Sequence, residues 1–422
     1  MNHAWPLTIR GTTATILALA FFIAAAQLGS VQLLAFGVLL LALVAVSLIA
    51  LHIARRDVTL TRSSNPAVVA AGGQARVTVH VAVRTALPTT PGTWADAVPA
   101  GLAGRSDGRF PALGSGLRGG DRAIDLVYDL QARQRGVHWL GPLELTIRDP
   151  FGIARRSAEI GELTRVIVTP ECVELPPLTA FAGATGGLLN ATTTRVGQGA
   201  DNLIARPYQP GDSMRRIHWP ATAHNDALMV RQEEQESTPE ATVVLDRATA
   251  RWAAAAAERP GADPAFEAAV RACVSAANAL VRDGYAVQVL DTDGTPLSEV
   301  LAGGEQSAVV TLVTRFAMLT THGTAGLGTL ARLWSGANTG PLVLVTSALG
   351  AEEVEALAPL PAHSMHPVLL ATGVAGDALE RAVATGWYAA SIAPGTELRD
   401  AWLQVSQTDL IAAEVAAHGR AG

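Results

Sequence analysis

Residues 206–236 read RPYQPGDSMRRIHWPATAHNDALMVRQEEQE and carry the densest signal in the chain. The Pro-Gly pair at 210–211 predicts a turn, because proline presets its own backbone angle and glycine tolerates a positive φ. Asp212 then stands at the N-cap position of a short helix over residues 213–219, where its carboxylate accepts free backbone N–H groups. The residues that follow predict a short apolar strand at 228–230.

The side chains of this stretch leave two interpretations open. In the first, the stretch is a connector: Trp219 belongs to a core and the acidic run at 233–236 is solvated. In the second, it is a binding surface in which Arg215, Arg216 and Arg231 bind an acidic partner or pair with that acidic run.

The stretch also resembles the signature of a bacterial family called domain of unknown function 58. The matching residues are Arg206, Tyr208, Gly211, Asp212, Arg215, Ile217, Trp219 and Arg231. The chain departs from the family pattern at Pro220 and His224, and an Asn202-Leu203 pair replaces the usual Glu-Phe. The resemblance implies a membrane-anchored chain that ends in a von Willebrand A-like domain and works with a MoxR-type AAA+ ATPase.

A second element, QRGVHWLGPL at 134–143 followed by RDPFGI at 148–153, is similar to the same family. Its residues predict a hairpin and a corner, because Asp149-Pro150 and Phe151-Gly152 are turn dipeptides, with the phenylalanine as an aromatic plug. A catalytic role for Asp149 is the less favoured alternative.

The composition excludes several classes of function. The 422 residues are 49% apolar with a mean hydropathy of +0.27, which indicates two or three domains and membrane segments. A net charge of −6 argues against nucleic acid, whose binding needs a concentrated basic face. The chain contains no Lys, so a P-loop and a Schiff-base enzyme are excluded. Its two cysteines form neither a disulfide framework nor a Cys-x-x-Cys site.

Two uncharged apolar runs near the N-terminus predict a transmembrane helical hairpin. The spans cover about 11–29 and 31–53, each near the ~20 residues that cross a bilayer as helix, and Gly29-Ser30 leaves room only for a tight turn. The alternative for the first run is a signal peptide, with Arg10 before the apolar run and alanines at 24–26 after it.

The orientation of this hairpin follows from its flanking charges. Arg55 and Arg56 come directly after the second run, with Arg62 close behind, and the turn between the runs carries no charge. The positive-inside rule therefore predicts a multi-pass cell-membrane protein whose large C-terminal part is cytoplasmic.

Residues 57–170 predict a small all-β, sandwich-like domain. The expected strands are residues 76–83, 124–130, 143–147 and 165–169. The first shows valine at every second position, which is typical of a half-buried strand. The Gly- and Pro-rich residues 85–120 predict long loops between the strands.

Residues 241–422 predict an α/β domain with a doubly wound sheet, which the resemblance makes von Willebrand A-like. The expected strands are 241–246, 286–290, 341–346, 366–371 and 387–392, and the expected helices are 264–282, 351–357, 377–384 and 397–406. Continuous apolar strands that alternate with helices are typical of a parallel sheet covered on both faces. The chain thus divides into a hairpin (1–56), a β domain (57–170), a signature segment that begins with a Pro176-Pro177 linker (171–240) and an α/β domain (241–422).

A candidate cation site stands at Asp246, at the end of the first predicted strand of the sheet, where ligands bind in such folds. The run DRATA at 246–250 resembles the metal-binding Asp-x-Ser-x-Ser of von Willebrand A domains, whose oxygens hold Mg²⁺. Alanine replaces both serines, and Thr346-Ser347 stands where the family usually has Thr-Asp. The resemblance therefore implies a degenerate site without metal or other cofactor, in which Asp246 caps a turn.

An acid–base cluster in the signature segment is disfavoured. His218 and His224 stand six residues apart, which does not place them on one helix face, and Pro220 is expected to interrupt any helix between them. Asp212 and Asp226 are the carboxylates such a cluster would use.

The favoured hypothesis is a non-enzymatic, membrane-anchored interaction or scaffold protein. Its expected partners are a MoxR-type AAA+ ATPase, membrane-protein neighbours and the lipid bilayer, in the assembly or remodelling of envelope complexes. The alternative is a metal-assisted hydrolase that uses Asp246 and the Asp212 region. A metal-dependent adhesion module outside the cell is a third class, which Arg55 and Arg56 disfavour.

Overall fold

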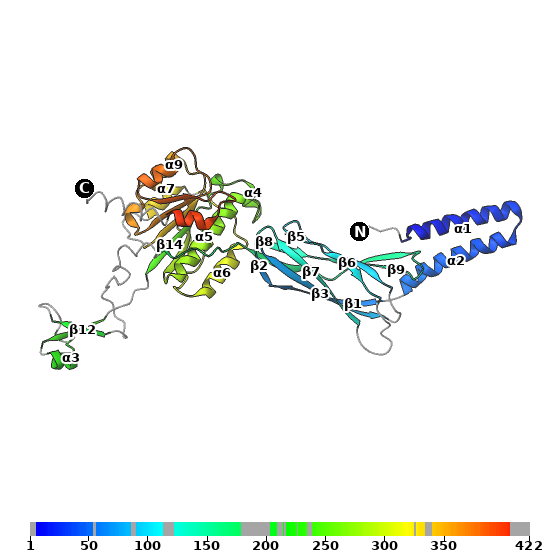
Figure 1. Cartoon of the computed structure of the whole chain (residues 1–422), viewed down its shortest axis with the longest axis horizontal. Helices are drawn as coiled ribbons and strands as arrows, with labels where there is room; N and C mark the ends of the chain where they lie inside the picture. The colour runs from blue at the N-terminus through cyan, green and yellow to red at the C-terminus, as the bar shows by residue number, and fades with distance from the viewer. Residues whose placement is uncertain are drawn as a thin grey trace. The chain divides into compact units, whose positions relative to one another are not determined.

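A computed structural model describes residues 6–53, 56–85, 90–112, 122–178, 203–208, 214, 217–225, 227–233, 239–324, 326–333 and 340–405 (Figure 1). The chain divides into two compact units. The first comprises residues 1–171 together with the short segment Phe316–Leu319, and the second comprises residues 172–315 and 320–422. The predicted layout of two apolar helices, β-sheet regions and a C-terminal parallel sheet is confirmed.

The first unit begins with two apolar helices, α1 (Ile9–Leu28) and α2 (Val31–Ile53). Thr8 caps α1 by accepting a hydrogen bond from the Gly11 N–H, and Gly29 ends it in the left-handed conformation that glycine adopts without strain. The two helices pack against each other, with the rings of Phe21 and Phe36 6.2 Å apart between centroids. Both helices are long and apolar enough to cross a membrane.

Among the described residues, the rest of the first unit forms three small sheets. The first has the order β1 (Arg56–Asn65), β3 (Gln74–Thr85), β7 (Arg122–Ala132) and β5 (Leu102–Ala103). The second has the order β10 (Arg155–Ile160), β9 (Leu143–Arg148), β4 (Gly92–Asp96) and β6 (Asp107–Phe110). The third has the order β2 (Val68–Ala70), β11 (Thr164–Thr169) and β8 (Gly136–Leu140). All neighbouring strands are antiparallel except β2 and β11.

The prediction of long loops over residues 85–120 was wrong in part, because β4, β5 and β6 form there. Each is too short to show a periodic pattern of its own. Trp94 and Phe110 point inward from β4 and β6 and are buried, so these strands are stabilised by pairing and packing with distant neighbours.

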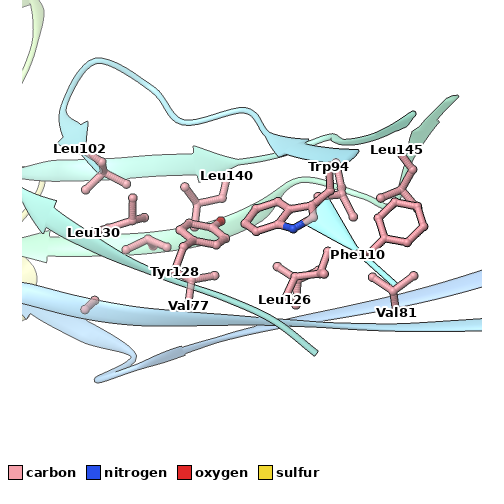
Figure 2. Packing of buried hydrophobic residues seen from close by; sticks show 14 of the residues in the cluster. Val77, Val81, Trp94, Leu102, Phe110, Leu126, Tyr128, Leu130, Leu140 and Leu145 are labelled. Atoms are coloured by element: carbon pink, nitrogen blue, oxygen red, sulfur yellow. The ribbon is translucent and has the colours of Figure 1, made fainter. Parts of the chain in front are cut away.

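One core lies between the two four-stranded sheets. Val77, Val79, Val81 and Val83 are buried along β3, as their alternation predicts. Figure 2 shows side chains of β3 and β7 pointing toward Trp94 and Phe110 of the facing sheet. The rings of Trp94 and Tyr128 lie 5.7 Å apart within this core.

A buried ion pair joins the two sheets beside this core. Arg62 on β1 and Asp96 on β4 approach to 2.8 Å, and both side chains are 0% exposed. Arg62 also donates to the hydroxyl of Thr164 and to the carbonyl of Leu140. The hydroxyl of Tyr128 donates to the same Asp96 carboxylate. The polar groups are therefore satisfied by one another, which burial without water requires.

The second unit is built on a five-stranded sheet in which all strands run parallel. Its order is β15 (Ala286–Asp291), β14 (Glu240–Leu245), β16 (Leu342–Thr346), β17 (Pro367–Ala371) and β18 (Tyr388–Ser391). From residue 239 onward, the described helices are α4 (Ala255–Glu258), α5 (Pro264–Arg282), α6 (Gln306–Phe316), α7 (Leu327–Leu333), α8 (Ala351–Leu357) and α9 (Ala378–Ala384), and residues 398–405 are also helical. Every residue of β16 and β17 is buried, so both faces of the sheet centre are covered.

Residues 173–178, which follow the first unit, pack against α5. The Pro176-Pro177 part of the expected linker is therefore packed against a helix. The Val173 N–H donates to the Ser275 hydroxyl at 2.9 Å, and the Leu178 N–H donates to Asp283 at 2.7 Å. Leu175 and Leu178 are buried. The two prolines therefore lie in a segment that packs against α5, where their missing N–H groups leave no donor without a partner.

In the signature segment, β12 (Leu203–Pro207) pairs antiparallel with β13 (Met229–Glu233), and α3 (Trp219–Asn225) lies between them in sequence. Of the helix expected over 213–219, residues 213, 215 and 216 lie outside the described residues; Ile217 bridges to Val230 of β13, and α3 begins at Trp219. The expectation that Pro220 interrupts the segment was wrong, because the proline stands in the first turn, where no N–H is needed. The His218 Nδ1 atom accepts from the Ala221 N–H at 3.0 Å, as a cap would. The predicted cap, Asp212, lies outside the described residues.

Candidate functional site

The polar edge of the parallel sheet is the candidate site. Strand β14 has β15 on one side and β16 on the other, so the direction of winding reverses between β14 and β16. Ligands of doubly wound sheets bind beyond the carboxyl ends of the strands at such a switch point. Asp246 directly follows β14 and Thr346 ends β16, so both residues stand at this point.

Asp246 is fully buried, and each of its carboxylate oxygens has a partner. Oδ1 accepts from the N–H of Ala248 at 3.0 Å, and Oδ2 accepts from the hydroxyl of Thr346 at 2.7 Å. The carbonyl oxygen of Asp246 accepts from Trp252 Nε1 at 3.0 Å. The carboxylate thus closes the turn after β14 and ties β14 to β16.

A guanidinium group from the same chain compensates the charge of this carboxylate. Arg251 Nε lies 2.9 Å from Asp246 Oδ2, and its Nη1 lies 3.5 Å from Glu353 Oε1. Glu353 stands in the first turn of α8 and accepts from the Gly350 N–H at 3.0 Å. Arg251 therefore connects the turn after β14 to the start of α8, with only 14% of its side chain exposed.

A second ion pair lies at the neighbouring strand end. Arg247 Nη1 is 3.4 Å from Asp291 Oδ2, at the end of β15, and Arg247 Nε donates to the carbonyl of Thr320 at 2.9 Å. Asp291 also accepts from the N–H of Thr292 at 2.7 Å. At this edge of the sheet, each of the two arginines therefore pairs with an aspartate, Arg251 with Asp246 and Arg247 with Asp291.

Burial dominates the electrostatics of these groups. It raises the pKa of Asp246 to about 6, although the hydrogen bonds from Thr346 and Ala248 and the charge of Arg251 act in the opposite direction. Burial likewise raises the pKa of Asp291 and lowers that of Arg247. Each charge is thus held at a cost in desolvation, which its partner offsets in part.

The residues at this edge do not fit a divalent cation. Such an ion needs several hard oxygen ligands that are free to coordinate it. Ala248 and Ala250 supply none, the Thr346 hydroxyl donates to Asp246, and the Arg251 guanidinium lies against the carboxylate. Among the described residues, no group of three or more His, Cys, Asp or Glu side chains is placed to hold a metal.

The sequence pointed to Asp246 and Thr346 but missed Arg251 and Glu353. Arg251 stands five residues after Asp246, in the short 3₁₀ turn Thr249–Arg251. In the sequence it is only a charged residue directly after the DRATA run at 246–250. Glu353 is about a hundred residues away in sequence, and no local pattern connects it to Asp246.

The signature residues lie in a different part of the second unit. Gly211, Asp212 and Arg215 lie outside the described residues, as do the side chains of Arg206 and Arg231, whose backbones belong to β12 and β13. Tyr208 and Ile217 are half-buried, and Ile217 bridges to Val230 of β13.

The expectation that Trp219 belongs to a core was wrong, because its side chain is 66% exposed. Met214 and Leu228 of the same segment are also exposed. The segment thus presents three large apolar side chains to solvent, which a connector packed into a core would not do.

The Asp149 corner is structural, as its turn residues predict. Asp149 is buried, and its carboxylate accepts from the N–H groups of Phe151 at 3.0 Å and Ala154 at 2.6 Å. The expectation that Phe151 is an aromatic plug was wrong, because its side chain is 56% exposed.

Two apolar N-terminal helices, small antiparallel sheets and a parallel α/β unit with an internally neutralised edge define a multidomain chain of mixed class. Residues 204–326 match the family described as "Protein of unknown function DUF58", the family that the signature residues predict.

Comparison with other proteins adds little. No curated protein matches the sequence. A CARDB domain from Pyrococcus furiosus is 17% identical over 27% of this chain and 93% of its own, with a TM-score of 0.19. A family two carbohydrate esterase from Cellvibrio japonicus is 8% identical over 84% of this chain and 96% of its own, with a TM-score of 0.17. Scores this low support no inference about fold or function.

Proposed function

We propose that the chain is a non-enzymatic, membrane-anchored interaction protein that works with a MoxR-type AAA+ ATPase in the assembly or remodelling of envelope complexes. The observation that carries the proposal is the exposure of Met214, Trp219 and Leu228 in the signature segment. Exposed apolar side chains gathered in one segment mark interaction sites, and tryptophan is enriched among residues that dominate binding energy. The ATPase partner comes from the family resemblance.

The membrane anchor in this proposal is the pair α1 and α2, supported by their length and apolar composition. We propose that both ends of the pair are cytoplasmic, together with the large C-terminal part. Arg62 does not contribute to this orientation as an exposed charge, because it is buried against Asp96. The orientation therefore depends on Arg55 and Arg56, which follow α2.

The parallel α/β unit is, in this proposal, a von Willebrand A-like domain that binds partners without a metal. The supporting observation is the Arg251 guanidinium on the Asp246 carboxylate, a fixed cation at the switch point of the sheet. The alternative, a metal-assisted hydrolase, needs Asp246 to be available to an ion. Both oxygens of that carboxylate are already engaged.

The test is a pulldown of the tagged full-length protein, extracted from its native membrane in detergent, with and without ATP and read by mass spectrometry. We expect recovery of an AAA+ ATPase that changes with nucleotide. Trp219→Ala should lose that recovery. Trp139→Ala is the matched control, because Trp139 on β8 is also exposed, at 51%, but lies outside the signature segment.

Two results would overturn the proposal. One is the absence of any AAA+ ATPase from the wild-type sample; the other is equal recovery by Trp219→Ala and wild type. Metal analysis of the purified protein addresses the hydrolase: stoichiometric Mg²⁺, Mn²⁺ or Zn²⁺ that disappears in Asp246→Asn would favour that alternative.

A further inference from the structure

The corner between β9 and β10 is a rigid turn that holds one aromatic side chain outward. The carboxylate of Asp149 fixes the turn through the N–H groups of Phe151 and Ala154, and Gly152 adopts φ +70. Ile153 and Ala154 are buried while Phe151 is 56% exposed. The exposure of the phenylalanine is therefore imposed by the backbone of the turn.

The start of α1 is hydrogen-bonded to this corner. The Thr8 hydroxyl donates to the carbonyl of Gly152 at 2.6 Å, and the Thr8 N–H donates to the carbonyl of Ile153 at 2.9 Å. The packing at Gly11 is equally close, since a Cβ added there would lie 2.2 Å from the Ile153 carbonyl oxygen. The first turn of the helix and the corner therefore form one body.

The end of α2 is joined to the same place. Arg156, the second residue of β10, donates from Nη1 to the carbonyl of Leu51 at 3.0 Å. That carbonyl belongs to the last turn of α2, where backbone oxygens have no partner within the helix. The corner thus lies where α1 begins and α2 ends.

We propose that this corner is a bilayer-contacting element, with the Phe151 side chain in the interfacial layer of the leaflet at these helix ends. The inference rests on the proposed membrane anchor. If α1 and α2 cross the bilayer, their hydrogen bonds to the corner fix Phe151 at the level where the helices meet the head groups. Phenylalanine is among the apolar side chains that bury at the boundary between head groups and acyl chains.

Two cationic residues, one at the start of α1 and one at the start of β10, fit an anionic lipid surface. Arg10, on the first turn of α1, and Arg155, at the start of β10, have exposed side chains. The Arg10 guanidinium lies close to Gly152, since a Cβ at that glycine would be 3.6 Å from Nη1. Cationic side chains near a bilayer are attracted to phosphate-bearing head groups.

A photoreactive benzoylphenylalanine placed at single positions of the full-length protein tests the proposal in vesicles of phosphatidylcholine and phosphatidylglycerol. The positions are 151, 16 and 163. Ile16 is an exposed residue of α1, and Leu163 is the matched control, 53% exposed and beyond the far end of β10. A six-residue strand separates Leu163 from the corner by roughly 20 Å.

After irradiation, position 151 should give lipid adducts at a yield near that of position 16 and about ten-fold above position 163, because only the first two lie at the bilayer in this geometry. A probe at the exposed Pro150 serves as a second variant if the substitution at 151 unfolds the corner, which hydrogen exchange over 149–156 reports.

The outcomes separate the inference from the anchor on which it rests. If position 16 forms no lipid adduct, the proposed membrane anchor fails. If position 16 labels lipid while 151 and 150 stay at the level of 163, the anchor stands and the bilayer-contacting corner is overturned. Protein adducts at 151 in place of lipid adducts overturn it as well and identify a protein partner.

Discussion

Asp96→Ala should destabilise the β-sheet part of the first unit strongly, because it leaves a guanidinium buried without its counter-charge. Arg62 and Asp96 are both 0% exposed and 2.8 Å apart. Removing one member of a buried pair costs about 3–5 kcal/mol, since the remaining charge stays desolvated. The Tyr128 hydroxyl also loses its acceptor, which adds about 1 kcal/mol.

A matched control lies in the same unit. Arg76 Nε and Asp129 Oδ1 are also 2.8 Å apart across neighbouring strands, but 65% and 59% of these side chains are exposed. Water replaces the lost partner there, so Asp129→Ala should leave stability almost unchanged. The two variants differ in burial and share the Arg–Asp chemistry.

The assay is native-state hydrogen exchange of the full-length protein in detergent, read on peptides from β4 and β7. The free energy of opening in these peptides should fall for Asp96→Ala and stay near wild type for Asp129→Ala. The double variant Arg62→Met, Asp96→Leu should recover much of the loss, because it removes both charges. Equal effects of Asp96→Ala and Asp129→Ala would refute the reasoning.

Three further outcomes are expected. Burial raises the pKa of Asp246 from 3.8 to about 6. The stability that its protonation contributes is therefore fully present below about pH 4 and is lost as the pH rises through 6. Relative to Asp246→Asn, the wild type should lose about 3 kcal/mol of stability between these limits, and hydrogen exchange of β14 that shows no such difference would contradict this prediction. Gly11→Ala places a Cβ 2.2 Å from a backbone oxygen and should speed exchange at Thr8 and at the corner, whereas Gly37→Ala meets nothing closer than 3.1 Å and should not. Trp219→Ala should leave thermal unfolding nearly unchanged, while Trp252→Ala, which removes a buried ring 5.0 Å from Phe266, should cost about 3–5 kcal/mol; the opposite order would return Trp219 to a core.

The local patterns of the sequence predicted the strands of the parallel sheet and the helices α5, α8 and α9 closely, whereas α4, α6 and α7 were not predicted. The expected helix 264–282 coincides with α5, and the five expected strands of the parallel sheet are all present, each end within one residue of its predicted place. The alternating valines fix which face of β3 is buried. These features depend on the period of apolar residues along a few turns or a single strand, which the sequence displays directly.

The candidate site was only half visible from the sequence. Asp246 stood out by its place after an apolar strand, and the absence of the two serine hydroxyls argued against a metal site there. The cation beside Asp246, Arg251, could be placed only by the fold of the turn. Its second partner, Glu353, could be placed only by the return of the chain after β16. Contacts between residues a hundred positions apart leave no periodic trace.

The sequence by itself determined the two apolar helices, the β and α/β character of the regions that follow, and the family match over residues 204–326, because each depends on residue order over short distances. Tertiary structure alone decided that Trp219 and Phe151 face outward, that Asp246 is neutralised by Arg251, and that the Asp149 corner holds the start of α1. Whether a side chain is buried or exposed is set by what packs beside it, and that is fixed only when distant segments meet.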